Sequence, residues 1–524
     1  MQNHIVCICL ALCTQYAFAQ LLTDAKRDYN WISGYILPPD TISPIYLNYL
    51  QGYRLDFITD PVNVIASFNR LDILYNIAIV SDEKGKLLFY TNGCKVADGK
   101  DSILANSNIN EGSLGYLSSC IGNGGNFINQ GTIALPKTSR KDEYYVLHLS
   151  YNLINSVIGF QADSLRLSKV VFDSTEQTLS LPFSDQVLIR GDSLFAGQLV
   201  ACRHGNGNDW WVVQPQSGRN GYYRLLVNTD TIQVVGLQNI GLPNHWQENG
   251  WGQACFSPDG TKYARYNGIT DLQVFDFDRC TGLLSNPLHV GITDFLDTSY
   301  ALGGVPGSGV AISPNSRYLY VSSITKVYQF DLQAPDLAAS QPTVAVYDGS
   351  YVDEGYWFTF NYMQLGPDGK IYMNAPGAIE TIHVIGQPDS AGLACQVVQH
   401  KYILDYPISR GWPYFPNFRL GPLPGGSCGS IATAEAGRPA AALRVFPNPA
   451  SQQVTVDVTL AAYDRPDRQV VVVNMLGQVV RRQPLPLYAS LLRVAVDDLP
   501  VGVYAVCLVE DGQLLAVKEF NVQH

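Results

Sequence analysis

The sequence is poor in charged residues and has no long apolar run after its first twenty positions. Asp, Glu, Lys and Arg make up 15% of the 524 residues, and the formal net charge is -11. The sequence has no cluster of basic residues. A surface that follows nucleic-acid phosphates needs clustered Lys and Arg, so we expect no nucleic-acid partner. No later segment reaches the roughly 18 consecutive apolar residues of a membrane-spanning helix, so we expect no transmembrane segment.

Motifs of common hydrolases and zinc sites are also missing. The chain has no His-Glu-x-x-His helix, and no Gly-x-Ser-x-Gly stands between a strand pattern and a helix pattern, as a nucleophile elbow requires. None of its cysteines has the CxxC or Cys/His spacing of a zinc site, so we expect no metal and no cofactor. These absences favour a protein that is not an enzyme. They leave room for an active site assembled from segments that are far apart in sequence.

Turn-forming and aromatic residues, in contrast, are abundant. The chain contains 46 Gly, 29 Pro and 31 Tyr. This mixture is typical of many short strands joined by tight turns, so we expect an all-β protein. The chain is too long to fold around one small hydrophobic core, so its length predicts two or three domains.

The first residues have the pattern of a secretory signal peptide. An apolar core at residues 5–12 is followed by Ala-Phe-Ala at 17–19, the small-x-small pattern that a signal peptidase recognises. We assign residues 1–19 to the signal, with cleavage after Ala19. The segment departs from the usual pattern because no Lys or Arg precedes the apolar core. A buried strand or helix is the alternative.

Three of the 11 cysteines lie in the predicted signal, and the others follow it. An exported chain meets an oxidising compartment, where disulfides persist, so we expect some of these cysteines to be bonded. Sequence does not determine connectivity, and pairing of sequence neighbours gives the candidates. The candidate pairs are Cys94 with Cys120, Cys255 with Cys280, and Cys395 with Cys428.

Three segments repeat one residue pattern: CFSPDGTKYARYN from Cys255, AISPNSRYLYVSS from Ala311 and QLGPDGKIYMNAP from Gln364. Pro presets φ at the first corner of a turn, Asp or Asn caps the second, and Gly accepts the positive φ that leads into the returning strand. Each segment is therefore predicted to be a hairpin. Ser316 replaces Gly in the second segment, where we expect a tighter or differently closed turn.

The repeat has the spacing of a propeller blade. Phe256, Ile312 and Leu365 hold equivalent places 53 to 56 residues apart, which suits a four-stranded blade. The strand that enters SPDG and leaves through Tyr resembles the WD-repeat-like propellers of bacterial exported proteins, over roughly residues 45–420. Earlier segments fit the same hairpin pattern more loosely, and with them the predicted number of blades is six. We expect a seventh that combines strands near 45–59 and 395–420; hairpins of a β-sandwich or β-helix are the alternative.

Composition changes after the last candidate disulfide. An Ala- and Gly-rich stretch without strand alternation predicts a linker at residues 429–442, which leaves 20–428 for the propeller. Phe-Pro-Asn-Pro at 446–449 excludes helix and fixes an extended entry. Alternating segments separated by MLGQ, LPVGVY and EDGQ follow, so residues 443–524 are predicted to form a small immunoglobulin-like sandwich.

The C-terminal sequence resembles a known export signal. VFPNPAS, NMLGQVV, LPVGVY and KEFNV occur in the order found in type A sorting domains of type IX secretion system cargo in certain Gram-negative bacteria. The resemblance implies recognition by the outer-membrane translocon, then removal of the domain and release of the cargo or its attachment to surface lipopolysaccharide. A plain sandwich module that binds a ligand is the alternative. The residues that carry the resemblance are Phe446, Pro447, Asn448, Pro449, Gly477, Gly502 and Tyr504.

Two polar and aromatic segments, RHGNGNDWW and NHWQENGWG, are the candidate ligand-binding regions. Their His, Asp and Glu residues are types that act as bases or ligands, and exposed Trp is frequent in binding hot spots. Nothing in the sequence fixes the distance between the segments. In the structural interpretation, the first is a hairpin turn with one Trp packed between blades. The candidate residues are His204, Asp209, Trp210, Trp211, His245, Trp246, Glu248 and Trp251.

We expect a binding or scaffold protein that is secreted or held at the cell surface after passing the periplasm. Its ligand would be a glycan or a protein. The alternative is a secreted hydrolase or lyase that acts on a polymer at the propeller funnel. A cluster of His204, His245 and a carboxylate within hydrogen-bond reach would favour the alternative, and their dispersal would contradict it.

Overall fold

The computed structural model is nearly all β, and its main division lies between Gly429 and Ser430. The only α-helix among the described residues is α2 (Leu114–Ser119). None of the described helices is long and apolar enough to cross a membrane. The structure describes residues 26–34, 52–67, 69–73, 75–121, 124–137, 140, 142–155, 159–228, 231–245, 250–292, 308–352, 356–376, 379–408, 411–424, 428, 442–459, 468–474, 478–486, 491–510 and 513–524.

The first unit consists of antiparallel sheets whose strands follow one another in chain order. The first four sheets contain β1 (Asn30–Ser33), β2 (Gly52–Asp56), β3 (Asn63–Ser67); β4 (Ala78–Ser81), β5 (Leu87–Thr91), β6 (Val96–Asp98); β7 (Thr132–Pro136), β8 (Glu143–Asn155), β9 (Gly159–Asp173), β10 (Thr178–Leu194); and β11 (Val200–Arg203), β12 (Trp210–Pro215), β13 (Gly221–Val227), β14 (Ile232–Asn239).

Three further four-stranded sheets complete this series, and the ribbon of β23 and β24 lies between the last two along the chain. Their strands are β15 (Gln253–Phe256), β16 (Lys262–Asn267), β17 (Asp271–Phe277), β18 (Leu284–Val290); β19 (Ser308–Ile312), β20 (Tyr318–Ser323), β21 (Lys326–Asp331), β22 (Thr343–Val346); β23 (Tyr351–Val352), β24 (Tyr356–Trp357); and β25 (Met363–Leu365), β26 (Ile371–Met373), β27 (Ile379–Ile385), β28 (Val397–Ile408).

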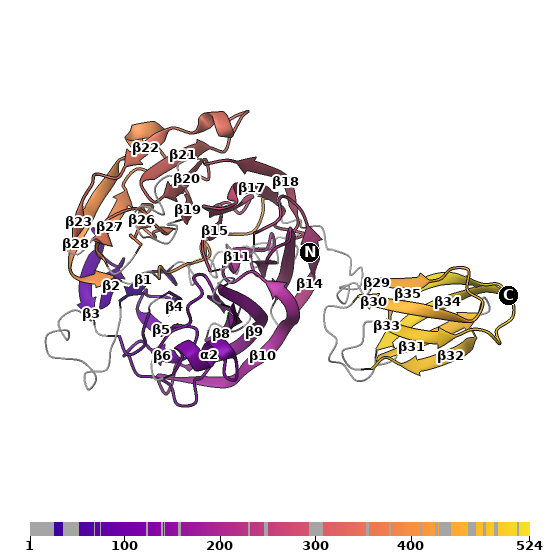
Figure 1. The fold of residues 1–524 in the computed structure, drawn as a ribbon. Coiled ribbons are helices and arrows are strands. Elements are labelled where there is room, and N and C mark those ends of the chain that lie inside the picture. Colours follow the sequence, from indigo (N-terminus) through magenta and orange to yellow (C-terminus); the bar gives the residue numbers. More distant parts are fainter. Residues whose placement is uncertain are drawn as a thin grey trace, which may run out of the picture. The chain divides into compact units, whose positions relative to one another are not determined.

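These sheets surround a common centre (Figure 1). Their first strands lie innermost, and β1 contacts β4, β4 contacts β7, β11 contacts β15, β15 contacts β19, and β19 contacts β25. Gln253 links three of these strands, because its amide donates to Met363 O and accepts from the backbone N–H groups of Val310 and Met363. The unit is therefore a β-propeller, as the sequence predicted. The predicted blade number stays a prediction.

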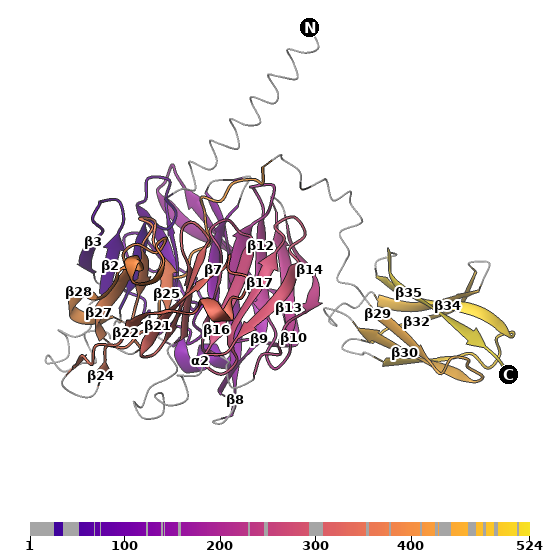
Figure 2. The same cartoon turned by 90° about the horizontal axis from the view of Figure 1, so that it is seen from above.

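The predicted closing sheet was wrong in its pairing. β28 pairs with β27 through the short turn η5 (Gly392–Cys395), whereas β1, β2 and β3 form a sheet of their own. Strands that follow each other along the chain tend to pair with each other. The last sheet therefore consists of β25 to β28 and contains none of the N-terminal strands. The first and last sheets nevertheless lie side by side, with β2 next to β28 (Figures 1 and 2).

The three repeated segments form the predicted hairpins, β15–β16, β19–β20 and β25–β26. At the last turn position φ is 73° in Gly260, 60° in Ser316 and 79° in Gly369. The expectation of a different turn at Ser316 was wrong, because this Ser adopts the left-handed conformation itself. Its hydroxyl accepts a hydrogen bond from Asp259 N at 3.0 Å, which helps to offset the strain.

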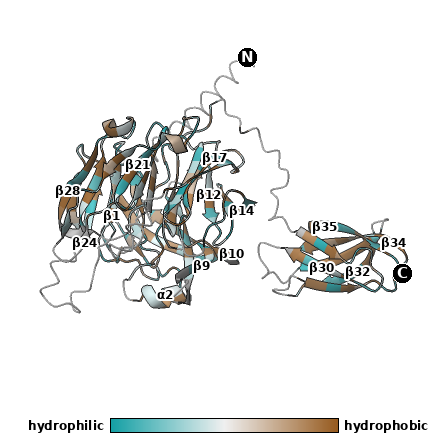
Figure 3. Cartoon of the chain, turned by 45° about the horizontal axis from the view of Figure 1, so that its top comes forward, coloured by the Kyte–Doolittle hydropathy of each residue, from teal (hydrophilic) through white to brown (hydrophobic). Residues whose placement is uncertain are grey.

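The second unit is a sandwich of two antiparallel sheets that share one core of mostly Val and Leu side chains. The strands of both units carry stretches of hydrophobic residues, brown in Figure 3. The first sheet contains β29 (Ala442–Phe446), β30 (Gln453–Thr459) and β33 (Leu491–Ala495). The second contains β32 (Val479–Pro484), β31 (Arg468–Asn474), β34 (Gly502–Glu510) and β35 (Gln513–Val522).

Stability should decrease in acid because of His148, which is fully buried on β8. Its ring nitrogens face Asn110 Oδ1 at 2.8 Å and Ser168 Oγ at 2.9 Å. Burial, together with the nearby Arg166, lowers the pKa of His148 to about 3. Between the ordinary pKa of about 6.5 and this value, the unfolded chain binds a proton that the folded chain does not.

The free energy of unfolding should therefore fall by up to about 1.4 kcal/mol per pH unit as the pH drops through this window. Unfolding midpoints between pH 7 and pH 4.5 measure the effect. The variant His148→Gln should show a shallower pH dependence than the natural chain. Equal slopes would contradict the assignment.

Candidate functional site

Three prolines of the repeated turns line a cavity at the centre of the propeller. Pro258, Pro314 and Pro367 are half-buried and border a space of about 260 Å³. Each occupies the first corner of its hairpin, where the fixed φ of Pro directs the chain back along the sheet. The residue pattern that revealed the hairpins in the sequence thus builds part of the lining of this cavity.

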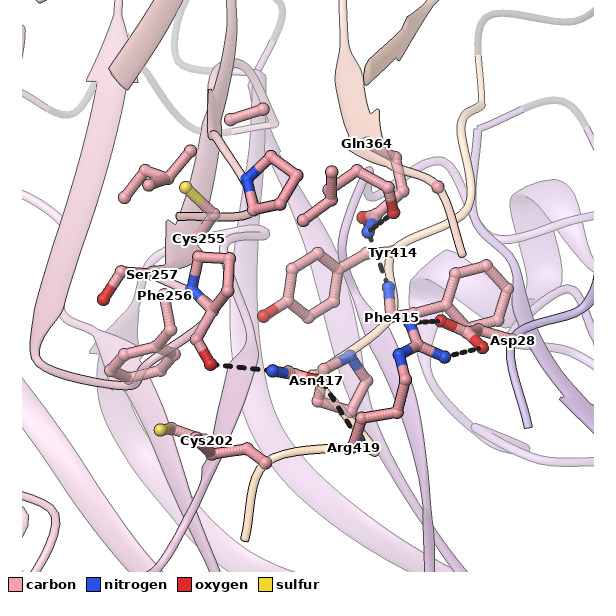
Figure 4. A pocket seen from close by; sticks show the side chains of 18 of the residues that line it. Asp28, Cys202, Cys255, Phe256, Ser257, Gln364, Tyr414, Phe415, Asn417 and Arg419 are labelled. Atoms are coloured by element: carbon pink, nitrogen blue, oxygen red, sulfur yellow. Dashed lines mark hydrogen bonds and ion pairs between the residues drawn. The ribbon is translucent and has the colours of Figure 1, made fainter. Parts of the chain in front are cut away.

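The cavity wall combines inner strands with a later segment, residues 411–424, which we call the strap. The strap contains no strand. Its Phe415 N donates to Gln364 Oε1 on β25 at 3.3 Å, and its Asn417 Nδ2 donates to Pro258 O at 2.7 Å (Figure 4). Tyr414 points its hydroxyl toward the side lined by Cys255 and other residues of the β15 hairpin (Figure 4).

Aromatic packing holds the strap against the inner strands. The ring of Trp412 lies 5.8 Å from that of Trp31 on β1, and Phe415 stacks on the same Trp31 at 5.9 Å. Further along, Phe418 meets Trp210 edge to face at 5.8 Å. These side chains are at most 7% exposed, so their burial stabilises the strap by several kcal/mol, of the order of 1.5 to 3 kcal/mol for each large apolar side chain.

One ion pair joins the strap to the segment that precedes β1. Arg419 Nη1 and Nη2 donate to the two carboxylate oxygens of Asp28 at 2.8 and 2.6 Å. The Asp28 side chain is 3% exposed, so the bidentate partner compensates a carboxylate that would otherwise be costly to bury. Asp28 is therefore committed to the strap.

Two thiols and a phenol of the cavity are held neutral, whereas Arg203 of the lining is a cation that lies over the Trp210 ring at 4.0 Å and donates to Asn208 O at 2.9 Å. Burial raises the pKa of the Cys202 thiol and of the Cys255 thiol to about 12, and neither cysteine is disulfide-bonded. Burial, together with the nearby Cys255 and Cys202, raises the pKa of Tyr414 well above its ordinary value. A protonated thiol is a poor nucleophile, so the described lining offers hydrogen bonds and apolar contacts instead of a nucleophile or base.

The predicted residues around β11 and β12 are structural. Trp210 and Trp211 are 0% and 2% exposed, and Trp211 Nε1 donates to Arg279 O at 2.8 Å. His204 is buried, with Nδ1 accepting from Asn206 N and Nε2 donating to Cys280 O. Neighbouring residues of a strand point to opposite faces, and both faces of β12 are buried, so the expectation of exposed binding aromatics was wrong for this pair. Half-buried Asp209 accepts from the Asn206 side chain within the turn.

The structure does not bring His204 and His245 together. His204 follows β11, where Gly205 N donates to Arg279 O, whereas His245 lies in the loop that precedes β15. At that opposite end, Gly250 N donates to Ala196 O just before β11. Half-buried Trp251 lies in the same loop as His245. Trp246 and Glu248 lie outside the described residues, and no described group of three His, Cys, Asp or Glu could hold a metal.

The disulfides differ from the predicted set in part. Cys94 bonds to Cys120, as predicted, whereas Cys280 bonds to Cys428. The predicted pairs Cys255–Cys280 and Cys395–Cys428 were wrong, because Cys255 on β15 and Cys395 in η5 are both buried and carry free thiols. The Cys280–Cys428 bond spans 148 residues, so nearness in sequence gave no sign of it.

The sorting-motif residues of the second unit divide into exposed and buried groups. Phe446 is 48% exposed, and the Pro-Asn-Pro at 447–449 is exposed with it, while Asn448 Oδ1 accepts from Asn521 N. Tyr504 is buried, and its hydroxyl donates to Pro500 O at 2.8 Å. A Cβ on Gly502 would meet no atom closer than 3.9 Å, so packing does not require this glycine. Gly477 lies outside the described residues.

The cavity residues on the strap escaped the sequence analysis. GWPYFPNFR contains four aromatic residues and two prolines, and the sequence analysis assigned it to the last strands. The available signal was this density of aromatic residues in a segment that forms neither strand nor helix. Such a segment has to bury its rings against elements elsewhere in the chain.

Residues 444–523 match the family model described as secretion system C-terminal sorting domain. The second unit is therefore a type IX secretion sorting domain, as the sequence resemblance implied. It marks the chain for export to the cell surface or the medium. No curated protein matches the chain.

Three of the solved structures with some similarity share 10 to 12% identity with the chain. A candidate 6-phosphogluconolactonase from Bacteroides uniformis (12% identity, TM-score 0.41) covers 73% of this chain and 98% of its own. For a Lactobacillus plantarum protein the values are 11%, 0.41, 74% and 98%, and for the Cps50 (Swd1) β-propeller domain of Myceliophteria thermophila 10%, 0.35, 62% and 87%. All three TM-scores are below 0.5, and the propeller assignment rests on the sheets of this chain.

Replacement by alanine should destabilise the protein more at Gly260 than at Gly369. In Gly260 a Cβ would lie 2.7 Å from Arg279 Cδ and 2.9 Å from both Cys202 Sγ and Leu420 Cδ2, whereas in Gly369 it would meet only Pro314 Cγ at 3.8 Å. Both have positive φ, which costs about 1 to 2 kcal/mol with a side chain. Overpacking should add about 1 to 3 kcal/mol for Gly260→Ala alone. Urea unfolding followed by Trp fluorescence measures the difference from the control Gly369→Ala, and equal losses would contradict the predicted overpacking.

Proposed function

We propose that this protein is an exported propeller whose role is to bind a small, uncharged ligand in the axial cavity. In this proposal, residues 1–19 are a cleaved signal peptide, 20–428 the binding propeller, 429–442 a linker and 443–524 the sorting domain. Recognition by the type IX translocon would bring the propeller outside the cell. The sorting domain would then be removed, with the product released or attached to lipopolysaccharide.

The observation that carries the binding role is that the described lining of the cavity offers no free base or nucleophile. Its described lining includes one carboxylate, Asp28, which is engaged by Arg419, and thiol and phenol groups whose pKa is raised by burial. Hydrolysis and elimination need a general base, a nucleophile or a metal near the reacting bond. The lining therefore supports binding better than the alternative of a hydrolase or lyase.

The ligand class follows from the groups that face the cavity. Tyr414 supplies an aromatic ring and a hydroxyl, Gln364 and Asn417 supply amides, and Phe256 and Leu365 supply apolar surface. Such a set suits a molecule with hydroxyl groups and an apolar face, as in one sugar unit of a glycan. The volume of about 260 Å³ lies just below the usual range of ligand pockets, which favours one unit over a longer chain.

The binding test uses the full-length exported protein and titration calorimetry with neutral monosaccharides. Glucuronic acid and glucose 6-phosphate serve as charged comparisons. We expect a neutral sugar to bind, and Tyr414→Phe to weaken its affinity by about tenfold, because one hydrogen bond to the ligand is lost. Tyr320→Phe is the matched control, since Tyr320 is buried outside the cavity lining.

Binding that is absent for every neutral sugar, or unaffected by Tyr414→Phe, would refute the cavity proposal. Incubation with glycan polymers tests the alternative function, a hydrolase or lyase. Soluble fragments released by the protein would establish a hydrolase or lyase.

The sorting role is tested by deleting residues 443–524 in a bacterium that has a type IX secretion system. The shortened propeller should accumulate in the periplasm, because the translocon lacks its recognition domain. Immunoblots of periplasm and medium measure the distribution, with the Tyr320→Phe full-length chain as an export control. Normal amounts of the shortened chain outside the cell would contradict the assignment.

A further inference from the structure

The strap is fixed to the propeller at both of its ends. Near its start, Trp412 packs on Trp31, and near its end Leu423 N donates to Gly205 O at 2.9 Å. Just beyond, Cys428 is bonded to Cys280 in the turn between β17 and β18. The disulfide packs directly on the turn after β11, because a Cβ on Gly205 would lie 2.3 Å from Cys428 Sγ and 3.0 Å from Cys280 Sγ.

We propose that the Cys280–Cys428 disulfide is a latch that keeps the strap closed over the axial cavity. Residues beyond Cys428 lead to the sorting domain. A pulling force on that part of the chain is therefore transmitted to the propeller through the bond between Cys428 and Cys280. With the bond intact the strap carries none of this load, whereas without it the load falls on the end of the strap, where Leu423 N donates to Gly205 O. The latch therefore separates the cavity wall from events at the export domain, and it does so whether or not the cavity binds a sugar.

The two disulfides differ in accessibility. Cys280 and Cys428 are both half-buried, whereas Cys94 and Cys120 are 0% and 2% exposed. An external dithiol reaches an exposed disulfide first. In the reaction, the two thiols of the dithiol are oxidised to their own disulfide, while Cys280 and Cys428 each gain one hydrogen. The latch is therefore the bond that mild reduction opens.

The cavity contains its own reporters of strap opening. Cys202 and Cys255 carry free thiols that line the cavity behind the strap. Cys202 Sγ and Leu420 Cδ2 of the strap both approach within 2.9 Å of the point where a Cβ on Gly260 would lie. Cys395, in contrast, is a buried free cysteine outside the cavity lining, so its reaction reports unfolding of the propeller as a whole.

The test is the rate at which iodoacetamide labels these thiols in the full-length protein, followed by peptide mass spectrometry. In the variant with Cys280→Ser and Cys428→Ser, Cys202 and Cys255 should react about tenfold faster or more, because the strap opens more often. The rate for Cys395 should stay as in the natural chain. The matched control carries Cys94→Ser and Cys120→Ser and should leave the ratio of cavity to Cys395 labelling unchanged.

Unchanged labelling of Cys202 and Cys255 in the latch variant would overturn the proposal. Labelling that rises in step with Cys395 would also overturn it, since the disulfide would then only add to global stability. Where the variant does not fold, mild dithiothreitol treatment of the folded natural protein replaces it. Cys280 and Cys428 should then be reduced before Cys94 and Cys120, with the same selective labelling. None of these outcomes depends on ligand binding, so the latch and the binding role can fail separately.

Discussion

Closure of the propeller depends on the packing around one buried side chain, Trp31. Among the described strands, no hydrogen-bonded pairing joins the first sheet to the seventh, so side chains have to hold the ring shut. Trp31 contacts Phe57 of its own sheet region, Tyr372 on β26, and both Trp412 and Phe415 of the strap. Large aromatic rings bury much apolar area with few rotamers, which suits a joint that lacks backbone hydrogen bonds.

The same packing determines the candidate site. Because the strap lies against Trp31, its next residues reach the inner strands, and Tyr414 and Asn417 become part of the cavity wall. The bidentate pair of Arg419 with Asp28 then removes the only described carboxylate of the lining from chemistry. A site built in this way offers shape and hydrogen bonds without a free carboxylate, which is the physical basis for a binding role.

The two units use their conspicuous residues differently. In the propeller the aromatic residues are interior packing, since Trp210 and Trp211 are buried on β12. In the sorting domain, Phe446 and the neighbouring Pro-Asn-Pro are exposed, and Gly502 has space for a side chain. Residues that the fold does not require but the family pattern contains are the expected contacts of a recognition domain.

The sequence by itself determined what local interactions control. Turn chemistry identified the hairpins, and motif order identified the sorting domain. It also gave the Cys94–Cys120 disulfide, whose partners are 26 residues apart. Only the tertiary structure decided the strap, the Cys280–Cys428 bond and the separation of His204 from His245. These depend on which distant sheets become neighbours when the ring closes, and that pairing is set by packing across the whole propeller, which no short stretch of sequence contains.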